Sequence, residues 1–291
     1  MKQKNWHWLR SMPINLHQLR NRIQKSLIAK GDESSSNTSL ILLSHALQQP
    51  KTWLLAHSEY EPTPDQIQFL QTLTDQYLKG VPLPYLLGEW EFFGRKFIVT
   101  PDVLIPRPET EHLVESALDY LQSIESPLIV DVGTGSGAIA VSLAAECPSA
   151  RVIAVDLSKP ALTIAQRNAR RLGQSQVDFL QTDLLSSLHT KFNLICANLP
   201  YIPSETLDTL EVARWEPRLA LDGGISGLED IRRLLIQARS RLSTPGALLM
   251  EIDASLGSES LSTAREILPQ ANCSLLKDLA GRDRIIKILQ K

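Results

Sequence analysis

Four consecutive residues in the second half of the chain have the types needed to hold a planar nitrogen group. Asn198, Leu199, Pro200 and Tyr201 follow the apolar run 192–197, which predicts a buried strand. An amide nitrogen is a poor nucleophile, so its hydrogens must be held by acceptors that aim its lone pair; the Asn198 side-chain oxygen and the Leu199 carbonyl can accept them. Pro200 has a fixed φ and keeps Leu199 out of the helical region, while Tyr201 offers an aromatic face. The segment predicts group transfer to an amide or amine nitrogen.

A glycine-rich turn is the second chemical feature. The apolar run 128–132 leads directly into Gly133, Thr134, Gly135, Ser136 and Gly137, and a helical pattern follows. Glycines let the backbone approach a ligand closely and adopt conformations that a side chain would forbid. The same turn also serves dinucleotides or a plain strand-to-helix connection, so it does not identify the ligand alone.

Acidic residues at the ends of the predicted strands narrow the choice of ligand. Asp156 closes the second strand, where a doubly wound fold places a carboxylate for the hydroxyls of an adenosine ribose. Asp131, inside the first strand, would repel a pyrophosphate and attract a cationic aminoacyl group, which favours S-adenosylmethionine over a dinucleotide. Asp183 and Leu184, after the third strand, are expected to accept the adenine amino group and to pack on its ring.

The remaining pattern predicts the elements that position these residues. From residue 127 onward, apolar runs alternate with helical stretches, which predicts a parallel sheet with helices on both faces, and the runs 273–277 and 284–289 predict a terminal hairpin. The first ninety or so residues have apolar side chains at helical spacing, interrupted at 31–39 by a small polar run that predicts an exposed loop. Aromatic residues around Gly94 predict a β-hairpin that links the two parts.

Bulk composition excludes several classes of protein. With 291 residues and 43% hydrophobic content, the chain can form one catalytic domain and a smaller companion. Its 30 basic and 32 acidic residues give a net charge of -2, which argues against a nucleic-acid or membrane partner. The three widely spaced cysteines favour reduced thiols over disulfides or a zinc site, so no metal is expected. Residues 1–30 contain no apolar stretch typical of a signal peptide or membrane span; we expect a cytoplasmic monomer.

Longer motifs resemble one family. Residues 103–111 read Val-Leu-Ile-Pro-Arg-Pro-Glu-Thr-Glu, after Tyr-Leu-Leu-Gly at 85–88 and Phe-Phe-Gly at 92–94. Residues 216–224 read Glu-Pro-Arg-Leu-Ala-Leu-Asp-Gly-Gly, and 277–284 read Lys-Asp-Leu-Ala-Gly-Arg-Asp-Arg. With the glycine turn and the Asn-Leu-Pro-Tyr segment, these motifs resemble the release factor glutamine N5-methyltransferases over roughly residues 80–291.

The resemblance implies a fold and an activity. The fold is α/β, a class I S-adenosylmethionine-dependent methyltransferase with a Rossmann-like seven-stranded sheet. It implies a helical substrate-binding domain at 1–84, a β-hairpin linker at 85–105 and a catalytic domain at 106–291. The implied enzyme methylates the side-chain nitrogen (N5) of the glutamine in the Gly-Gly-Gln motif of peptide chain release factors, its protein substrates, and so tunes translation termination.

The resemblance also implies roles for individual residues. The segment 198–201 would hold the glutamine amide and catalyse transfer, and a second group would line the channel by which the substrate enters: Phe92, Phe93, Pro106 and Arg107. S-adenosylmethionine would be bound by Asp131, Gly133, Thr134, Gly135, Ser136, Gly137, Asp156, Asp183, Leu184 and Asn198. The sequence departs from the family pattern at Leu199, usually proline, and at Asp253 and Leu256, usually glycine and glutamine.

Two alternatives remain open. Leu199 is more familiar from adenine N6-dimethyltransferases of ribosomal RNA, so the same loop could hold an adenine of RNA or DNA. Those enzymes usually carry a different glycine motif and place their extra domain after the catalytic one. The chain could also bind the cofactor without catalysis, if the departures at Asp253 and Leu256 disabled the site.

Overall fold

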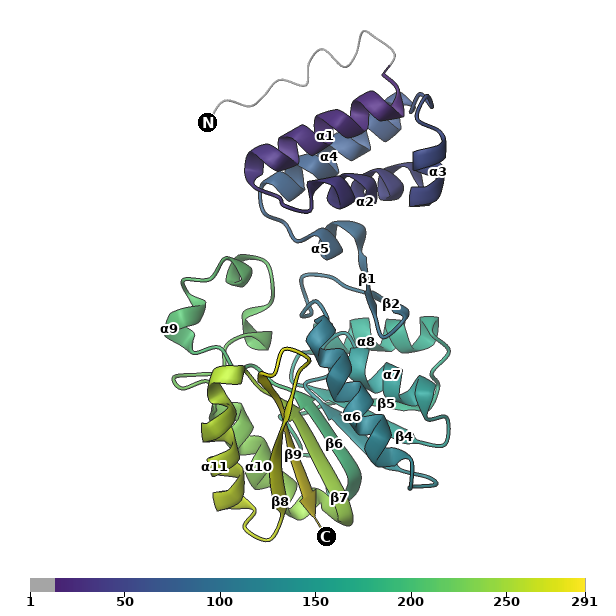
Figure 1. The fold of residues 1–291 in the computed structure, drawn as a ribbon. Coiled ribbons are helices and arrows are strands. Elements are labelled where there is room, and N and C mark those ends of the chain that lie inside the picture. Colours follow the sequence, from purple (N-terminus) through teal and green to yellow (C-terminus); the bar gives the residue numbers. More distant parts are fainter. Residues whose placement is uncertain (1–13, 291) are drawn as a thin grey trace. The chain divides into compact units, whose positions relative to one another are not determined.

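The computed structural model describes residues 14–290, which divide into two compact units between Leu87 and Gly88 (Figure 1). Segment 1–13, part of the stretch predicted to lack a signal peptide, lies outside the described residues. Between residues 14 and 290, no helix combines the length and the apolar character needed to cross a membrane.

The first unit consists of helices whose ends are specified locally. Before α1, the Asn15 side chain accepts a hydrogen bond from the Gln18 backbone N–H while the Gln18 side chain reaches back to Asn15, and α4 begins with a capping box of the same kind. Apolar residues of α1, α2 and α4 form one buried cluster. The helices are α1 (Leu16–Lys30), α2 (Ser35–Leu47), α3 (Lys51–Ala56), α4 (Pro64–Leu78) and α5 (Leu83–Leu87). The helical bundle predicted from the apolar spacing is confirmed.

The exposed loop predicted at 31–39 is wrong in its second half. Helix α2 begins at Ser35, and Ser35 and Ser39 are buried. The Ser39 hydroxyl donates to the Ser36 carbonyl at 2.8 Å. A small hydroxyl residue can be buried in a helix when it bonds to a preceding carbonyl, so polar composition did not mark the start of this helix.

The second unit contains a seven-stranded sheet in the order β5-β4-β3-β6-β7-β9-β8. The first five strands in this order are parallel, and β9 pairs antiparallel with both β7 and β8. The strands are β3 (Leu128–Val132), β4 (Arg151–Asp156), β5 (Val177–Gln181), β6 (Phe192–Asn198), β7 (Leu242–Glu251), β8 (Asn272–Lys277) and β9 (Asp283–Gln290). The predicted parallel sheet and terminal hairpin are confirmed.

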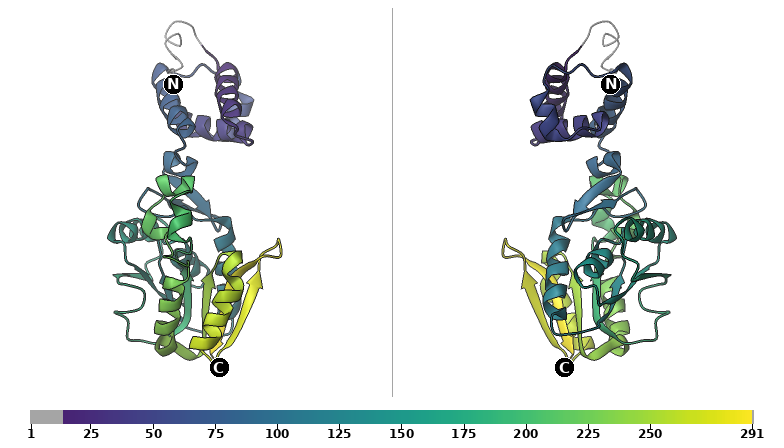
Figure 2. Two further views of the ribbon diagram at one scale, coloured as in Figure 1. Left: turned by 90° about the vertical axis from the view of Figure 1, so that its left-hand side faces the viewer. Right: turned by 90° about the vertical axis from the view of Figure 1, so that its right-hand side faces the viewer.

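Helices cover both faces of this sheet, as expected (Figures 1 and 2). Helices α6 (Glu111–Leu121), α7 (Ala138–Glu146) and α8 (Lys159–Arg171) pack on one face. Helices α10 (Glu229–Arg241) and α11 (Gly257–Ile267) pack on the other. Neighbouring residues of one strand therefore enter different clusters, as Ile129 and Val130 do, which is why the strands read as continuous apolar runs.

The β-hairpin predicted as a separate linker belongs to the second unit. Strand β1 (Glu89–Phe92) pairs antiparallel with β2 (Arg95–Ile98). Phe92 and Phe97 are buried, stack edge-on with ring centres 6.0 Å apart, and share the cluster of α6 and α7. The division at Leu87 and Gly88 therefore differs from the predicted boundaries at 84 and 105, because the burial of these rings fixes the hairpin to the sheet domain.

Asn168 of α8 joins the hairpin to the glycine turn. Its side-chain oxygen accepts from the Ile98 N–H at 2.7 Å, and its amide nitrogen donates to the Ile98 carbonyl at 3.0 Å and to the Ser136 carbonyl at 2.8 Å. The side chain is buried, and it satisfies the buried Ser136 carbonyl and two backbone groups of partly buried Ile98.

Replacing this side chain should destabilise the second unit. We expect Asn168→Ala to lower the free energy of unfolding by roughly 2–4 kcal/mol, because it leaves the buried Ser136 carbonyl and two partly buried backbone groups of Ile98 without this partner. Denaturant titration measures the change. Arg170→Ala, an exposed position on the same helix, is the control and should stay within about 0.5 kcal/mol of wild type. Equal effects of the two variants would contradict the anchoring role of Asn168.

Candidate active site

A cleft lies at the carboxyl ends of β3, β4 and β6. Strands β4 and β6 lie on opposite sides of β3, so the order in which strands are added to the sheet reverses at β3. Open α/β sheets bind ligands at such a point. The predicted residues that line the cleft are Gly133, Gly135, Asp156, Asp183, Leu184, Asn198, Leu199 and Pro200. Residues that line it without having been predicted include Val103, Leu104, Leu157, Leu219 and Arg233.

The glycine turn between β3 and α7 is held by the neighbouring strand. The backbone N–H groups of Gly133 and Thr134 both donate to the Val155 carbonyl, each at 2.9 Å. Gly133 has φ +73°, and a Cβ added there would lie 3.2 Å from the Leu199 Cδ2 atom. Glycine at this position therefore permits both the turn and its close approach to the segment after β6. Behind the cleft lie the other members of the motif, Thr134, Ser136 and Gly137, which do not line it.

Asp156 ends β4 at the wall of the cleft. Its Oδ2 atom accepts from the Gly135 N–H and its Oδ1 atom from the Ser158 N–H, both at 2.8 Å. Burial raises the pKa of this carboxyl, and the backbone N–H groups of Ser158 and Gly135 oppose that rise. The carboxylate thus connects the glycine turn to the start of α8 and presents an acceptor to the cleft.

Asp131 was predicted to contact the cofactor, but it does not line the cleft. Its side chain is completely buried, and its Oδ2 atom accepts from the Thr134 hydroxyl at 2.6 Å and from the Ala140 N–H at 3.2 Å. Burial raises its pKa to about 7. The strand directs this residue into the layer between sheet and helix, so it holds the turn and the start of α7 from beneath instead of contacting a ligand directly.

Asp183 and Leu184 form another wall of the cleft. Leu184 is buried in a left-handed conformation with φ +50°, and the next residue, Leu185, donates its N–H to the Gln237 side chain at 2.7 Å. The Asp183 Oδ2 atom pairs with Arg233, which also binds Asp230 at 2.7 Å. Arg233 of α10 therefore holds Asp183, the predicted acceptor for the adenine amino group. The spacing of apolar residues in the sequence could not predict this contact.

The segment 198–201 lies directly after β6, as predicted. The Asn198 Nδ2 atom donates to the Thr110 hydroxyl oxygen at 3.1 Å, and Leu199 is buried next to the glycine turn. Asn198 is the register partner of Glu251 at the end of β7. Asn198, Leu199 and Pro200 all line the cleft.

Tyr201 lies behind this segment and does not line the cleft. A Cβ added to Gly227 would lie 2.3 Å from the Tyr201 carbonyl oxygen, and one added to Gly223 would lie 2.7 Å from its Cα. Glycines of the segment 221–227 therefore allow close backbone packing against Tyr201. Burial, with nearby Glu251 and Asp253, raises the pKa of its hydroxyl to about 12, so this group stays protonated near neutral pH and is not a base.

The residues predicted to line a substrate channel have different environments. Phe92 is a core residue with 1% exposure, and the Phe93 N–H donates to the Glu111 side chain at 2.8 Å; neither lines the cleft. Pro106 is buried, and half-exposed Arg107 pairs with Glu216 at 2.5 Å. For Phe92 the structure contradicts the prediction, because the ring packs in the core of the sheet domain. In the sequence, buried aromatic residues near a motif cannot be distinguished from a binding surface.

Glu216 begins the family-like motif 216–224 and has a structural role that the sequence does not predict. It is buried at 5%, and besides Arg107 it accepts from the Ile105 N–H at 3.1 Å. Glu216 thus connects the segment 105–107 to the part of the chain between Tyr201 and α10. A glutamate before proline gave no signal for this role in the sequence.

The two parts of the chain match two different family descriptions. Residues 18–88 match the family described as PrmC N-terminal domain, and residues 111–214 match the family described as Methyltransferase small domain. The release factor glutamine methyltransferase of Moorella thermoacetica is 43% identical over 274 residues, 93% of this chain and 97% of the relative. The enzyme of the same name from Bordetella pertussis is 42% identical over 251 residues, 84% of this chain and 91% of the relative.

Among solved structures, a 16S rRNA N2 G1207 methyltransferase of T. thermophilus, in complex with AdoMet and guanosine, has a TM-score of 0.53 with this chain. The match covers 70% of this chain and 50% of that one at 15% identity. This likeness shows a shared methyltransferase fold. Within residues 14–290, no cluster of His, Cys, Asp and Glu is arranged to hold a metal ion.

The contact between Gly133 and Leu199 can be tested with a matched pair of substitutions. Gly133→Ala and Gly173→Ala have nearly the same backbone strain, with φ +73° and +72°, but a Cβ at Gly173 meets nothing within 4 Å. We expect both to destabilise the protein by about 1–2 kcal/mol. Only Gly133→Ala should weaken S-adenosylmethionine binding, by roughly tenfold or more in calorimetric titration. Equal affinities in the two variants would count against a cofactor site at this turn.

Proposed function

The chain belongs to the release factor glutamine methyltransferases, and from this membership we propose that it methylates the side-chain N5 of the glutamine in the Gly-Gly-Gln motif of peptide chain release factors. The methyl donor is S-adenosylmethionine, and the reaction tunes translation termination in the cytoplasm. One observation carries the proposal: Asn198, Leu199 and Pro200 border the same cleft as the glycine turn and Asp156.

The described residues fit the proposed cofactor. A carboxylate at the end of β4 suits a ribose, and apolar Leu184 and Leu157 suit an adenine ring. Asp183 gives its Oδ2 atom to Arg233, so we assign its Oδ1 atom as the acceptor for an amino group on the ring. The glycine turn, where an added Cβ would reach Leu199, suits a ligand that needs close backbone approach. When bound, S-adenosylmethionine supplies the electrophilic methyl group.

The protein contributes orientation to the reaction. The Asn198 Oδ1 atom and the Leu199 carbonyl accept the two hydrogens of the substrate amide, which directs the nitrogen lone pair toward the methyl carbon. The nitrogen would gain the methyl group that bound S-adenosylmethionine supplies, and the proton that it loses would pass to solvent. Leucine at 199 preserves the carbonyl that proline would supply at this position.

Binding of the protein substrate is assigned to two regions. We propose that the helical unit, which matches the PrmC N-terminal domain, contacts the release factor. Half-exposed Arg107, the adjoining Pro106 and Phe93 are proposed to border the entrance for the glutamine. The net charge of -2 favours a protein over a nucleic-acid substrate, and we propose that the enzyme acts as a monomer.

Isotope transfer tests the proposed function. With labelled S-adenosylmethionine and an unmodified release factor, we expect label on the glutamine of the Gly-Gly-Gln motif, located by mass spectrometry, and none after that glutamine is changed to alanine. Label on ribosomal RNA or DNA, but not on release factor, would instead establish the adenine alternative. Cofactor binding without transfer to any of these substrates would indicate an adaptor.

The same assay tests the residue at the centre of the proposal. Asn198→Ala should reduce kcat by about 100-fold or more, because an acceptor at the reacting nitrogen is lost. Asn193→Ala is the matched control: Asn193 lies on the same strand and accepts from the Leu128 N–H at 2.8 Å, at the end of β6 remote from the cleft. It should retain most of the activity. Near wild-type turnover in Asn198→Ala would contradict the mechanism.

A further inference from the structure

The proposed transfer depends on which end of the Asn198 amide faces the substrate. Its oxygen can accept a hydrogen from the glutamine nitrogen, whereas its NH2 group would repel it. The two ends have nearly the same shape, so a half-turn of the terminal bond would exchange them without altering packing. A binding loop that relies on this oxygen needs neighbours that distinguish nitrogen from oxygen.

Thr110 is one such neighbour. It ends the short 3₁₀ helix Pro108–Thr110, within the family-like segment 103–111, and its side chain is 4% exposed. Its hydroxyl oxygen accepts from the Asn198 Nδ2 atom at 3.1 Å. A hydroxyl can also donate, however, so Thr110 alone could satisfy either orientation of the amide.

Glu251 removes this ambiguity. It is the register partner of Asn198 on the adjacent strand, and its side chain is 2% exposed. Burial raises the pKa of its carboxyl, while hydrogen bonds from Thr110 and Asn198 and the charge of Arg284 lower it. An ionised carboxylate only accepts hydrogen bonds. An ionised Glu251 can only accept from the Thr110 hydroxyl, which would leave the hydroxyl oxygen to accept from Asn198.

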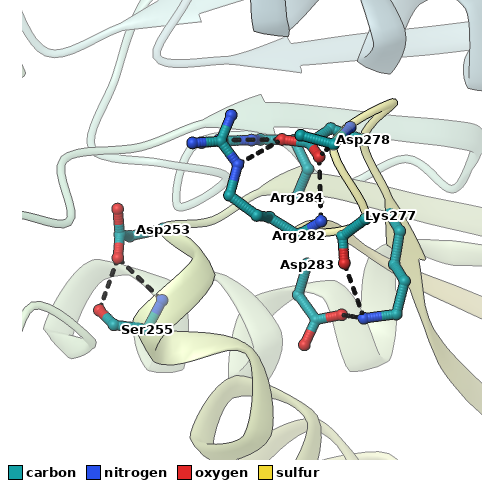
Figure 3. Close-up of polar contacts among 9 residues, drawn as sticks. Asp253, Ser255, Lys277, Asp278, Arg282, Asp283 and Arg284 are labelled. Atoms are coloured by element: carbon teal, nitrogen blue, oxygen red, sulfur yellow. Dashed lines mark hydrogen bonds and ion pairs between the residues drawn. The ribbon is translucent and has the colours of Figure 1, made fainter.

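Arg284 supplies the positive charge near Glu251 from the neighbouring strand. Its backbone carbonyl accepts from the Ile252 N–H at 2.9 Å, and its side chain is 11% exposed. Figure 3 shows the terminal turn that holds it: Asp278 binds the Arg284 guanidinium at 3.3 Å and also accepts from the Arg282 backbone at 3.0 Å. The family-like motif 277–284 therefore brings a cation beside the buried carboxylate.

We propose that Thr110 and Glu251 are positioning residues that engage the hydrogens of the Asn198 amide and so leave its oxygen facing the cleft. This inference rests on the proposed function, since it explains how the loop discriminates the substrate nitrogen. It assigns a shared purpose to three separate motifs: the segment 103–111 supplies Thr110, the segment 198–201 supplies Asn198, and the segment 277–284 supplies the charge that supports Glu251.

A packing role does not account for Glu251. Its Oε2 atom is buried and has no hydrogen-bond partner among the described residues, which is an unfavourable state for a carboxylate. An apolar side chain at the end of β7 would complete the sheet core without that cost. The observed residue is explained by its requirement as an obligate acceptor beside Asn198.

Threonine substitutions test the proposal under the conditions of the transfer assay. We expect Thr110→Val, which keeps the shape and removes the acceptor, to lower kcat by roughly 10- to 100-fold with little change in KM or in S-adenosylmethionine affinity. Thr110→Ser should restore most of kcat. The matched control is Thr263→Val on α11, another buried threonine that does not line the cleft, and its kcat should equal that of wild type.

The pH profile supplies a readout that a purely structural role would not change. Glu109, Arg284 and Tyr201 face Glu251 from other elements; Glu109 raises its pKa, and Tyr201 stays protonated over the range concerned. A raised pKa means that Glu251 gains its proton at a higher pH than an ordinary glutamate. We therefore expect wild-type kcat to fall as pH is lowered through that raised pKa, and the fall to be absent in Glu251→Gln.

The outcomes separate this inference from the function on which it rests. If the wild-type enzyme does not label the release factor glutamine, the proposed function is wrong before any variant is compared. If wild type transfers label but Thr110→Val matches Thr263→Val in kcat, or Glu251→Gln keeps the acidic fall, the positioning role is wrong while the function stands. Should Glu251→Gln not fold, the threonine series decides the question.

Discussion

Strands β3 and β6 lie side by side although β4, β5 and their helices separate them in the chain, and this adjacency brings the glycine turn against the segment 198–201. The approach is so close that a single added carbon at Gly133 would meet Leu199 at 3.2 Å. A methyl donor and its acceptor must be held in line at short distance, and neither loop could provide this alone. The site therefore depends on parallel pairing at the point where the sheet reverses its strand order.

The surrounding structure limits the freedom of both loops. Asp131 and the Val155 carbonyl hold the glycine turn from beneath and from the side, and Asn168 connects it to the β-hairpin. Across the cleft, close backbone packing of Gly223 and Gly227 restrains the segment at Tyr201. Because transfer to an amide relies on orientation more than on a base, this restraint is the main contribution of the fold to the proposed chemistry.

Three carboxylates that are buried or partly buried lie around the cleft, and each is held differently. Asp131 accepts from a hydroxyl and a backbone N–H, Asp156 from two backbone N–H groups, and Glu251 lies near the charge of Arg284. Burial raises the pKa of all three. Their surroundings decide whether a carboxylate supports the backbone, faces a ligand or orients another side chain.

Sequence alone determined the features that arise from local chemistry. Apolar spacing predicted the helices and strands, and the glycine turn, Asp156 and the segment 198–201 were placed correctly at strand ends, because strand direction fixes which end carries each loop. Only the tertiary structure showed that Phe92 is core, that Asp131 lies under the turn, and that the hairpin belongs to the sheet domain. It also brought Thr110 and Glu251 to Asn198. Such contacts depend on which strands become neighbours and which face each side chain takes, and residues far apart in the chain carry no local signal of either.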